Sequence, residues 1–270
     1  MKPETTVKPS AEDIQREYFN RLLDKYEAHY DDPTSQLYRR RFIFEPMFEG
    51  LDFSGKHVLE AMCGSGPTTA YLLERGARVT GLDVSDSAVA SFEARWPGCR
   101  GIRASIFDSQ LEDASFDMVI VQAGLHHLHP RLNDALEELY RILKPGGYFC
   151  FSEPHRGSLY DGARNLWYRF DRDIFAENEE SVDVEAMSEQ FHGRFVCEKT
   201  HYLGSVAYFL VAQSMVLRIP LWAKKYYAPA AFFLERLFSP LMGKRTAPLV
   251  ACRWRKCDQP RQLDGSEAAS

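Results

Sequence analysis

The first residues that can do chemistry lie in a glycine-rich segment, residues 58–67, with the sequence VLEAMCGSGP. An apolar run ends there in a tight turn, and a helical pattern follows from Thr68 to Arg75, with Gly76 just past its end. Gly64 and Gly66 allow backbone angles that a side chain forbids, so the chain can pass close to a bound ligand. A strand, a glycine turn and a helix N-terminus in this order predict a nucleotide-type binding site.

A carboxylate follows this turn at the distance that a nucleotide site requires. Asp83 ends a second apolar strand pattern, residues 77–83, about 20 residues after the glycines. One carboxylate can accept hydrogen bonds from both hydroxyls of a ribose. The alternative is that Asp83 only caps the helix expected over residues 85–96, a task that Ser85 or Asp86 could also perform. We favour the ribose role because strand, turn and acid occur in that order.

The details of the turn argue against a dinucleotide ligand. A dinucleotide fingerprint needs a third glycine for close packing of helix and strand, whereas Pro67, Thr68 and Thr69 follow Gly66 here. Glu60, at the end of the first strand pattern, would repel a pyrophosphate but suits a ligand that carries an ammonium group. S-adenosylmethionine has an ammonium, a sulfonium and a ribose, and it has no phosphate.

With these features the chain resembles the class I S-adenosylmethionine-dependent methyltransferases. Residues 58–66 are similar to the family's first motif, V-L-D-x-G-C-G-T-G, with Glu60 in place of Asp and Met62 in place of the usual glycine. The resemblance covers about residues 55–155. The other segments that match family motifs are, in chain order, residues 79–85, 104–111, 115–121 and 139–147.

The resemblance implies an α/β fold with a doubly wound, mostly parallel seven-stranded sheet and helices on both faces, a Rossmann-like architecture. It also implies S-adenosyl-L-methionine as the cofactor and S-adenosyl-L-homocysteine as the product. Ser105 stands where the family often has an acid that binds the adenine amino group, so its contribution should be smaller. The cofactor-binding residues expected from the motifs are Glu60, Ala61, Cys63, Gly64, Gly66, Asp83, Val84, Ser105, Ile106 and Gln122.

Length and composition agree with one large α/β domain with additions. The chain has 270 residues, of which 45% are hydrophobic, and four apolar strand patterns alternate with helical ones between residues 57 and 152. Its six cysteines show no C-x-x-C pairing and no histidine at metal-ligand spacing, so we expect no metal site and a reducing, cytoplasmic compartment. The polar N-terminus leads us to expect no signal peptide.

The elements that must position the site divide the chain into a core and additions. The N-terminal helical lid carries Tyr30 and Tyr38, which can meet the methionine end of the cofactor or act as packing residues. Inserted helices are expected to form a substrate cap. The expected segments are a flexible tail at 1–10, the lid at 11–50, the methyltransferase domain at 51–257 with inserts at about 155–180 and 206–245, and a flexible tail at 258–270.

The candidate catalytic base is His126. Methyl transfer is an in-line displacement at a carbon that the sulfonium already activates, so most of the catalysis can come from holding the acceptor close with water excluded. A base is needed only where the acceptor is protonated. His126 lies in the segment GLHHLH at the end of the fourth strand pattern, and histidine titrates near neutrality. The alternative, that this histidine packs inward or caps, stays open.

Residues 155–180 are expected to contact the acceptor. They are rich in aromatic and guanidinium groups and follow the fifth strand, where ligands bind in open α/β sheets. A planar or anionic acceptor would fit them, while a solvated helix with buried aromatic stems is the equal alternative. The substrate-binding candidates here and in the histidine segment are His127, His155, Arg164, Trp167 and Tyr168.

A basic and aromatic stretch lies near the C-terminus. Residues 218–256 contain nine Lys or Arg and one acid, Glu235, although the whole chain has a formal charge of −5. The apolar run that precedes it, residues 206–217, is too short to span a bilayer. Residues 206–256 therefore predict peripheral contact with an anionic membrane or a cover over a hydrophobic substrate with an acidic head. An ordinary capping hairpin with a basic exterior is the alternative.

The predicted reaction is methyl transfer to a small-molecule acceptor, an apolar or aromatic metabolite with an acidic group as an option. No nucleic acid is expected as a partner, because the fourth strand ends in QAGL and lacks the Asn/Asp-Pro-Pro-aromatic signature of amino-group enzymes for DNA or RNA. A protein methyltransferase and a non-catalytic cofactor-binding subunit of a larger complex stay as alternatives. The sequence assigns neither the acceptor atom nor the oligomeric state.

Overall fold

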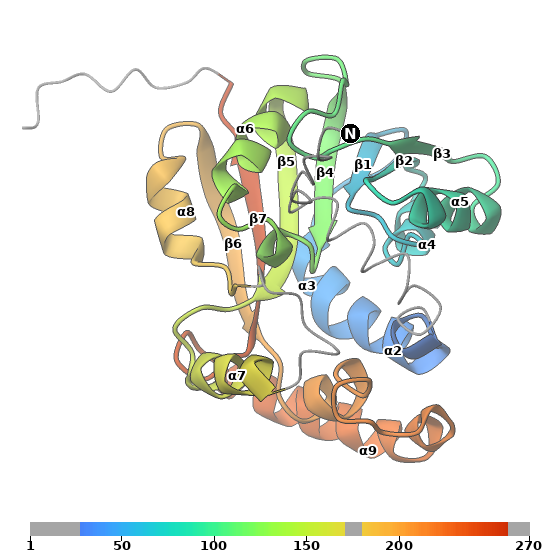
Figure 1. The fold of residues 1–270 in the computed structure, drawn as a ribbon, viewed down its shortest axis with the longest axis vertical. Coiled ribbons are helices and arrows are strands. Elements are labelled where there is room, and N and C mark those ends of the chain that lie inside the picture. The colour runs from blue at the N-terminus through green and yellow to red at the C-terminus, as the bar shows by residue number, and fades with distance from the viewer. Residues whose placement is uncertain (1–27, 171–179, 259–270) are drawn as a thin grey trace, which may run out of the picture.

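Seven strands form a single sheet in the order β3-β2-β1-β4-β5-β7-β6 (Figure 1). The computed structural model describes residues 28–170 and 180–258, with the side chains of 165–170 outside the description. All pairs are parallel except those of β7, which runs antiparallel to β5 and β6. The predicted fold class is therefore confirmed. The strands are β1 (His57–Ala61), β2 (Arg78–Asp83), β3 (Arg100–Arg103), β4 (Phe116–Gln122), β5 (Leu143–Pro154), β6 (Phe195–Leu203) and β7 (Leu249–Lys256).

Helices cover both faces of this sheet, because successive strand residues point to opposite faces and both faces are apolar. Val58 belongs to one buried cluster and its neighbour Leu59 to the other. The first cluster adds α2 (Pro33–Arg39), α3 (Glu45–Phe48), α4 (Thr69–Leu73), α5 (Asp86–Arg95) and α9 (Leu221–Phe238). The second adds α6 (Leu132–Ile142) and α8 (Val184–Gln190). The remaining elements are α7 (Leu159–Phe170), the π-helices η1 (Arg40–Phe44) and η3 (Tyr208–Ala212), and the 3₁₀ helices η2 (Leu125–His127) and η4 (Ser239–Leu241).

The sheet register brings four strand ends to one edge. Ala61 of β1 lies beside Leu82 of β2 and Val121 of β4, and Gln122 lies beside Ser152 of β5. The loops that leave β1, β2, β4 and β5 therefore start next to one another. This edge is where an open α/β sheet binds its ligands.

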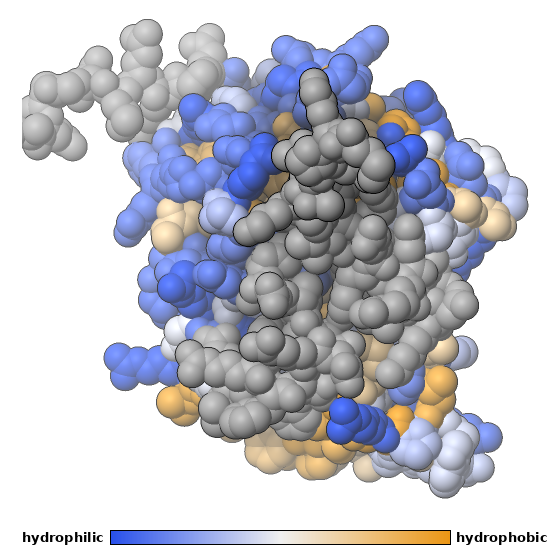
Figure 2. Space-filling view, viewed as in Figure 1, coloured by the Kyte–Doolittle hydropathy of each residue, from blue (hydrophilic) through white to orange (hydrophobic). Residues whose placement is uncertain are grey.

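The N-terminal segment and the C-terminal insert contact each other below this edge in Figure 1. Residues 28–50 contain α2, η1 and α3, whereas residues 11–27 of the predicted lid lie outside the described residues. Between β6 and β7 lie η3, α9 and η4, within the predicted insert at 206–245. Figure 2 shows apolar side chains gathered along the lower edge of the molecule, where α9 runs in Figure 1.

Two charged side chains of α9 are buried and attach it to the rest of the molecule. Lys224 donates to His29 O and Asp32 Oδ2, both at 2.6 Å, and to Ser35 Oγ at 2.8 Å. The carboxyl group of Glu235 accepts from the chain that leaves β6, through the backbone N–H groups of Ser205, Ala207 and Tyr208 and the hydroxyl of Ser205. It also accepts from the hydroxyl of Tyr38 in α2.

We expect Glu235→Ala to lower the free energy of unfolding by about 3 kcal/mol or more, because it leaves several buried donors without an acceptor. Denaturation in urea measures the difference. The matched control is Arg236→Ala, at an exposed position one residue further on, which should change the free energy by less than about 0.5 kcal/mol. Equal stability of the two variants would contradict the role assigned to Glu235.

Candidate functional site

The glycine loop after β1 has two glycines with different tasks. Both have positive φ, +49° at Gly64 and +78° at Gly66. A Cβ on Gly66 would lie 2.5 Å from Nε1 of Trp96, so this glycine is required by packing beneath the loop. Among the described residues, a Cβ on Gly64 would meet nothing within 4 Å. The loop is therefore open on the side of Gly64, where a ligand can approach its backbone.

Glu60 secures this loop from below. Its side chain is almost fully buried at the end of β1. One oxygen accepts from the backbone N–H of Thr68 at 2.9 Å, and the other accepts from the hydroxyl of Thr69 at 2.5 Å. Burial raises the pKa of Glu60 to about 7. In the structure this carboxyl group caps the start of α4, and its predicted contact with an ammonium group stays a prediction.

Asp83, at the end of β2, faces the glycine loop. It accepts from Gly64 N at 3.0 Å through Oδ2 and from Ser85 N at 2.9 Å through Oδ1. The capping alternative is wrong, because Ser85 is the N-cap of α5 and accepts from Ala88 N at 3.1 Å. Backbone N–H groups of Gly64, Val84 and Ser85 stabilise this carboxylate, whose two oxygens can together accept more bonds than these. Burial raises the pKa of this carboxyl group above its usual range.

The other predicted cofactor residues lie on the same edge of the sheet. Ala61 and Cys63 are buried beside the loop, and Val84 follows Asp83 directly. Ser105 Oγ accepts from Phe107 N at 3.1 Å, so part of its acceptor capacity stabilises its own turn, next to the buried Ile106. At the end of β4, Gln122 Oε1 is buried and has no hydrogen-bond partner among the described residues.

His126 is paired with a carboxyl group that the sequence motifs do not indicate. His126 Nδ1 lies 2.8 Å from Oε2 of Glu153, near the end of β5. Glu153 is fully buried, and its Oε1 accepts from the backbone N–H groups of Gly124 and Leu125, each at 2.8 Å. Burial raises the pKa of Glu153 to about 8 and lowers the pKa of His126. The only sequence signal for Glu153 is an acid at the end of an otherwise apolar strand.

The pair formed by His126 and Glu153 is connected to the glycine loop through Met62. A Cβ on Gly124 would lie 2.8 Å from Met62 Sδ, so the loop after β1 and the loop after β4 touch at these two residues. Met62 has a positive φ of 55° in place of the family's glycine. The side chain of Met62 therefore fills the space between the glycine loop and the loop that carries His126 and His127.

Known proteins match the part of the chain that forms this edge. The methyltransferase-domain family matches residues 59–151. An uncharacterized methyltransferase of Synechocystis is 34% identical over 105 residues, which are 38% of this chain and 50% of that protein. A phthiotriol/phenolphthiotriol dimycocerosates methyltransferase of Mycobacterium tuberculosis is 35% identical over 108 residues, 38% of this chain and 39% of that protein. This chain thus spans half or less of the curated relatives it matches.

The chain carries a class I S-adenosylmethionine-dependent methyltransferase domain. Among solved structures, the N-methyltransferase NodS of Bradyrhizobium japonicum, in complex with S-adenosyl-L-homocysteine, has the same fold. The TM-score is 0.56 with 15% identity, and the match covers 89% of this chain and 97% of NodS. The match to the methyltransferase-domain family confirms the predicted family for residues 59–151, and the likeness to NodS concerns the fold alone.

The methyltransferase domain offers groups that fit the expected cofactor. Gly64 is open to a ligand, Asp83 retains acceptor capacity for ribose hydroxyls, and the buried Gln122 Oε1 can accept from an N–H donor. No group of three His, Cys, Asp or Glu within residues 28–170 and 180–258 is arranged to hold a metal ion. These side chains would bind and orient a nucleoside with an amino-acid tail.

The predicted substrate residues are divided between the site and its surroundings. The ring of His127 lies 3.9 Å from that of His126, and both are buried in η2. His155 Nε2 contacts the carbonyl oxygen of Lys244 at 2.9 Å, so this side chain joins the end of β5 to the chain before β7. Arg164 pairs with Asp161, which balances its charge. Trp167 and Tyr168 lie on α7, but their side chains fall outside the described residues.

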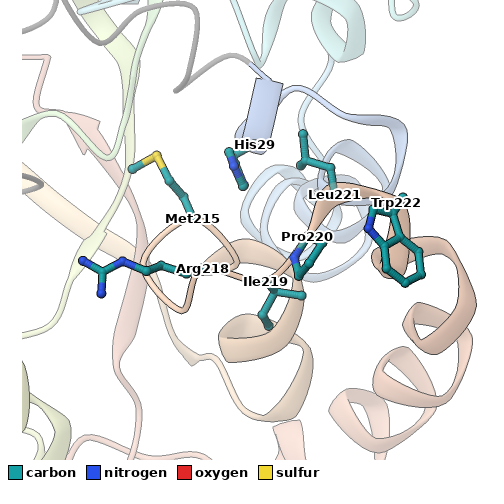
Figure 3. Close-up of a pocket in the computed structure, with 7 residues that line it drawn as sticks. All are labelled: His29, Met215, Arg218, Ile219, Pro220, Leu221 and Trp222. Atoms are coloured by element: carbon teal, nitrogen blue, oxygen red, sulfur yellow. The ribbon is translucent and has the colours of Figure 1, made fainter.

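A pocket with mainly apolar walls opens beside the N-terminal segment. It has a volume of about 620 Å³. Figure 3 shows Met215 and Arg218 on one side, Pro220, Leu221 and Trp222 on the other, and His29 at its upper rim. His29 is two residues before Asp31, so the pocket adjoins the segment that reaches the glycine loop. The sequence motifs did not indicate this pocket.

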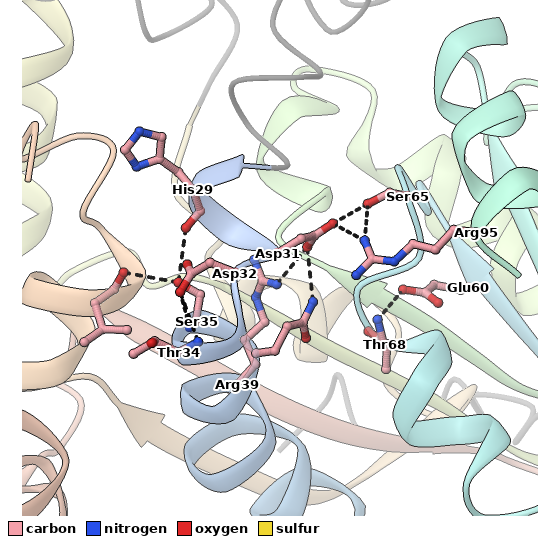
Figure 4. A network of polar contacts seen from close by, with 12 residues as sticks. His29, Asp31, Asp32, Thr34, Ser35, Arg39, Glu60, Ser65, Thr68 and Arg95 are labelled. Atoms are coloured by element: carbon pink, nitrogen blue, oxygen red, sulfur yellow. Dashed lines mark hydrogen bonds and ion pairs between the residues drawn. The ribbon is translucent and has the colours of Figure 1, made fainter. Parts of the chain in front are cut away.

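The N-terminal segment contacts the glycine loop through Asp31. Its carboxylate accepts from Ser65 Oγ and Arg95 Nη1, each at 2.5 Å, and from Arg39 Nη1 at 3.4 Å (Figure 4). Ser65 stands between the two loop glycines. The lid prediction rested on tyrosines, but the fully buried Tyr38 is a packing residue that donates to Glu235. The sequence gives no signal for the contact of Asp31 with the glycine loop and α5, because Ser65 and Arg95 are 34 and 64 residues away.

We expect Glu60→Gln to remove a pH dependence of stability. The pKa of Glu60 is about 7 in the folded chain and near 4.5 when unfolded, so the folded state holds the extra proton between these values. The contribution is complete below about pH 4.5 and is lost as the pH rises to about 7, by an amount on the order of 3 kcal/mol. Urea titrations of both proteins across this range measure it, and parallel curves would contradict it.

We expect Asp83→Asn to weaken binding of S-adenosyl-L-homocysteine by about tenfold to a hundredfold, because it removes charge-assisted acceptors for the ribose. Isothermal titration calorimetry measures the affinity. Asp86→Asn, at the exposed first position of α5, is the matched control and should bind as the unchanged chain does. Unchanged affinity in Asp83→Asn, with an unchanged melting temperature, would contradict the ribose role.

Proposed function

We propose that this chain is an S-adenosylmethionine-dependent methyltransferase that transfers a methyl group to a small acceptor by in-line displacement. The observation that carries this proposal is the contact between the glycine loop and the His126–Glu153 pair across Met62 and Gly124. This contact supports a base beside the proposed donor site. When bound, S-adenosylmethionine supplies a methyl carbon that its sulfonium makes electrophilic.

The chain's own residues would orient the acceptor and take its proton. Ionised Glu153 accepts Nδ1–H of His126, which leaves Nε2 of the neutral imidazole as the acceptor of a proton from an O–H or N–H group. Three backbone N–H groups, from Gly124, Leu125 and His126, hold the Glu153 carboxyl group in place. His126 is the catalytic candidate in this scheme, and Glu153 is a positioning residue.

The contact between Asp31 and Ser65 supports the predicted lid. Asp31 lies on the segment before α2 and reaches Ser65 in the glycine loop, so the described part of the lid, residues 28–50, would cover the cofactor from outside the sheet. Water exclusion strengthens the electrostatic interactions within such a site and holds the reactants at attack distance. In this proposal the lid closes by forming the Asp31–Ser65–Arg95 contacts.

The acceptor is proposed to be a small molecule with an apolar or aromatic body. The name of the M. tuberculosis relative describes transfer to phthiotriol and phenolphthiotriol dimycocerosates, which supports a small-molecule acceptor. The pocket beside His29 is lined mainly by apolar side chains. An acidic group on the acceptor has less support, because Asp161 already balances the charge of Arg164.

An acceptor screen with labelled S-adenosylmethionine tests the proposal. The compounds should span phenols, isoprenoids, fatty acids and amines, and transfer to one class by the purified chain is the expected result. A chain that binds the cofactor but transfers to none of these classes until another protein is added would instead favour the non-catalytic subunit.

We expect His126→Gln to lower turnover of an acceptor found in that screen by about 10²–10⁴-fold without changing cofactor affinity. His192→Gln, an exposed histidine beyond α8, is the matched control. Turnover of the unchanged chain should rise with pH through about 8, where Glu153 loses its proton and His126 Nε2 becomes available. Glu153→Gln should abolish that rise, and a flat profile in the unchanged chain would contradict the base.

A further inference from the structure

Helix α9 is inverted relative to an ordinary surface helix. Lys224 and Glu235 are buried on its inner face, with the partners described above, together with Ala228, Ala231 and Phe232. An amphipathic helix normally buries apolar residues and exposes charged ones. The polar contacts of Lys224 and Glu235 fix the orientation of α9, so its outward face is set by the fold.

The outward face is apolar and aromatic. Trp222 and Tyr226 are each 70% exposed, Phe233 is 68% exposed and Leu237 is 56% exposed. Their spacing of four, seven and four residues places them in one stripe along the helix. Leu241, in the following turn, is 70% exposed and extends the stripe. Figure 2 shows hydrophobic residues along the lower edge of the molecule, where α9 runs in Figure 1.

The exposed charges that residues 218–256 themselves contribute are all positive. Lys225 and Arg236 are exposed on α9, and Arg245 is exposed after η4. Glu235 is the single acid between residues 218 and 256, and it points inward. Not every base of this stretch contributes, because Lys224, Arg253 and Lys256 are buried against carbonyl or carboxylate groups. The simple count of nine basic residues therefore overstates the basic surface, but its sign is correct.

We propose that the outer face of α9 binds an anionic phospholipid surface, with the helix lying parallel to it. Aromatic and aliphatic side chains enter the boundary between headgroups and acyl chains, while Lys225 and Arg236 contact lipid phosphates. Within the part of the chain that is described, no helix is long and apolar enough to cross a membrane. A second copy of this chain fits the face less well, because a symmetric contact would bring these unpaired cations together.

Flotation of the full chain with vesicles tests this proposal and needs no methyl acceptor. The chain should float with vesicles of phosphatidylglycerol and phosphatidylcholine, and raising the salt concentration should release it. It should not float with phosphatidylcholine alone. Failure to float with anionic vesicles at low salt would overturn the proposal, whereas it would leave the proposed methyl transfer untouched.

Variants distinguish α9 from general adhesion. Trp222→Ser with Phe233→Ser should weaken vesicle binding at least about tenfold, because two exposed aromatic anchors are lost. Lys225→Gln with Arg236→Gln should weaken it roughly tenfold or more and reduce the salt dependence. The matched controls are Val196→Ser on β6 and Arg78→Gln with Arg100→Gln on β2 and β3. All three residues are exposed and lie outside α9. Equal losses in the controls would overturn the proposal.

Fluorescence gives a readout that a change in folding does not mimic. Brominated lipid should quench the emission of the chain, and Trp222→Phe, which keeps the face apolar, should lose most of that quenching while it still floats. Sedimentation equilibrium tests whether a second copy of the chain binds to the outer face of α9 instead. Self-association that Trp222→Ser with Phe233→Ser abolishes, in a chain that binds no vesicles, would assign the face to a second copy and overturn the membrane proposal.

Discussion

Buried carboxyl groups organise the loops on which this site depends. A chain that leaves a strand and turns sharply exposes backbone N–H groups that no neighbouring strand can pair. Glu60 satisfies the N–H of Thr68, Glu153 those of Gly124 and Leu125, and Glu235 those of Ser205 and Ala207. In each case the carboxyl group lies inside the molecule and the loop folds over it. The burial that makes these bonds strong also raises the pKa of Glu60 and of Glu153.

This arrangement explains why the site combines a fixed geometry with groups that titrate near neutrality. Loop backbone held by buried side chains cannot relax easily, so Gly64 keeps its open face and His126 keeps its orientation. Because burial raises the pKa of Glu60 to about 7 and that of Glu153 to about 8, these two carboxyl groups change protonation state close to physiological pH. The pH dependence of stability expected from Glu60 and the proposed role of Glu153 in orienting His126 therefore depend on one physical cause, the cost of burying a negative charge.

The sequence predicted the sheet, the glycine loop and the acid after the second strand because these features are local in the chain. Asp83 lies 19 residues from Gly64 in the contact that joins them, and a repeated strand and helix pattern encodes that distance. Glu153 lies 27 residues from His126, and nothing in the histidine segment announces a partner on the next strand. Asp31 and Lys224 form contacts with residues distant in sequence, which depend on packing of whole elements. Hydrophobic periodicity also could not give the orientation of α9, because both of its faces contain aromatic residues.

Two carboxyl groups hold the glycine loop, and this affects how a ligand would bind and dissociate. Glu60 holds the loop from the inside, and Asp31 holds Ser65 from the outside. The inner bond belongs to the folded core, whereas the outer one joins the loop to a segment that packs on it from elsewhere in the chain. If the proposed lid covers the cofactor, exchange of a spent donor for a fresh one would require the outer bond to break first. The dwell time of the nucleoside would then depend on the detachment of a single carboxylate from a serine and an arginine.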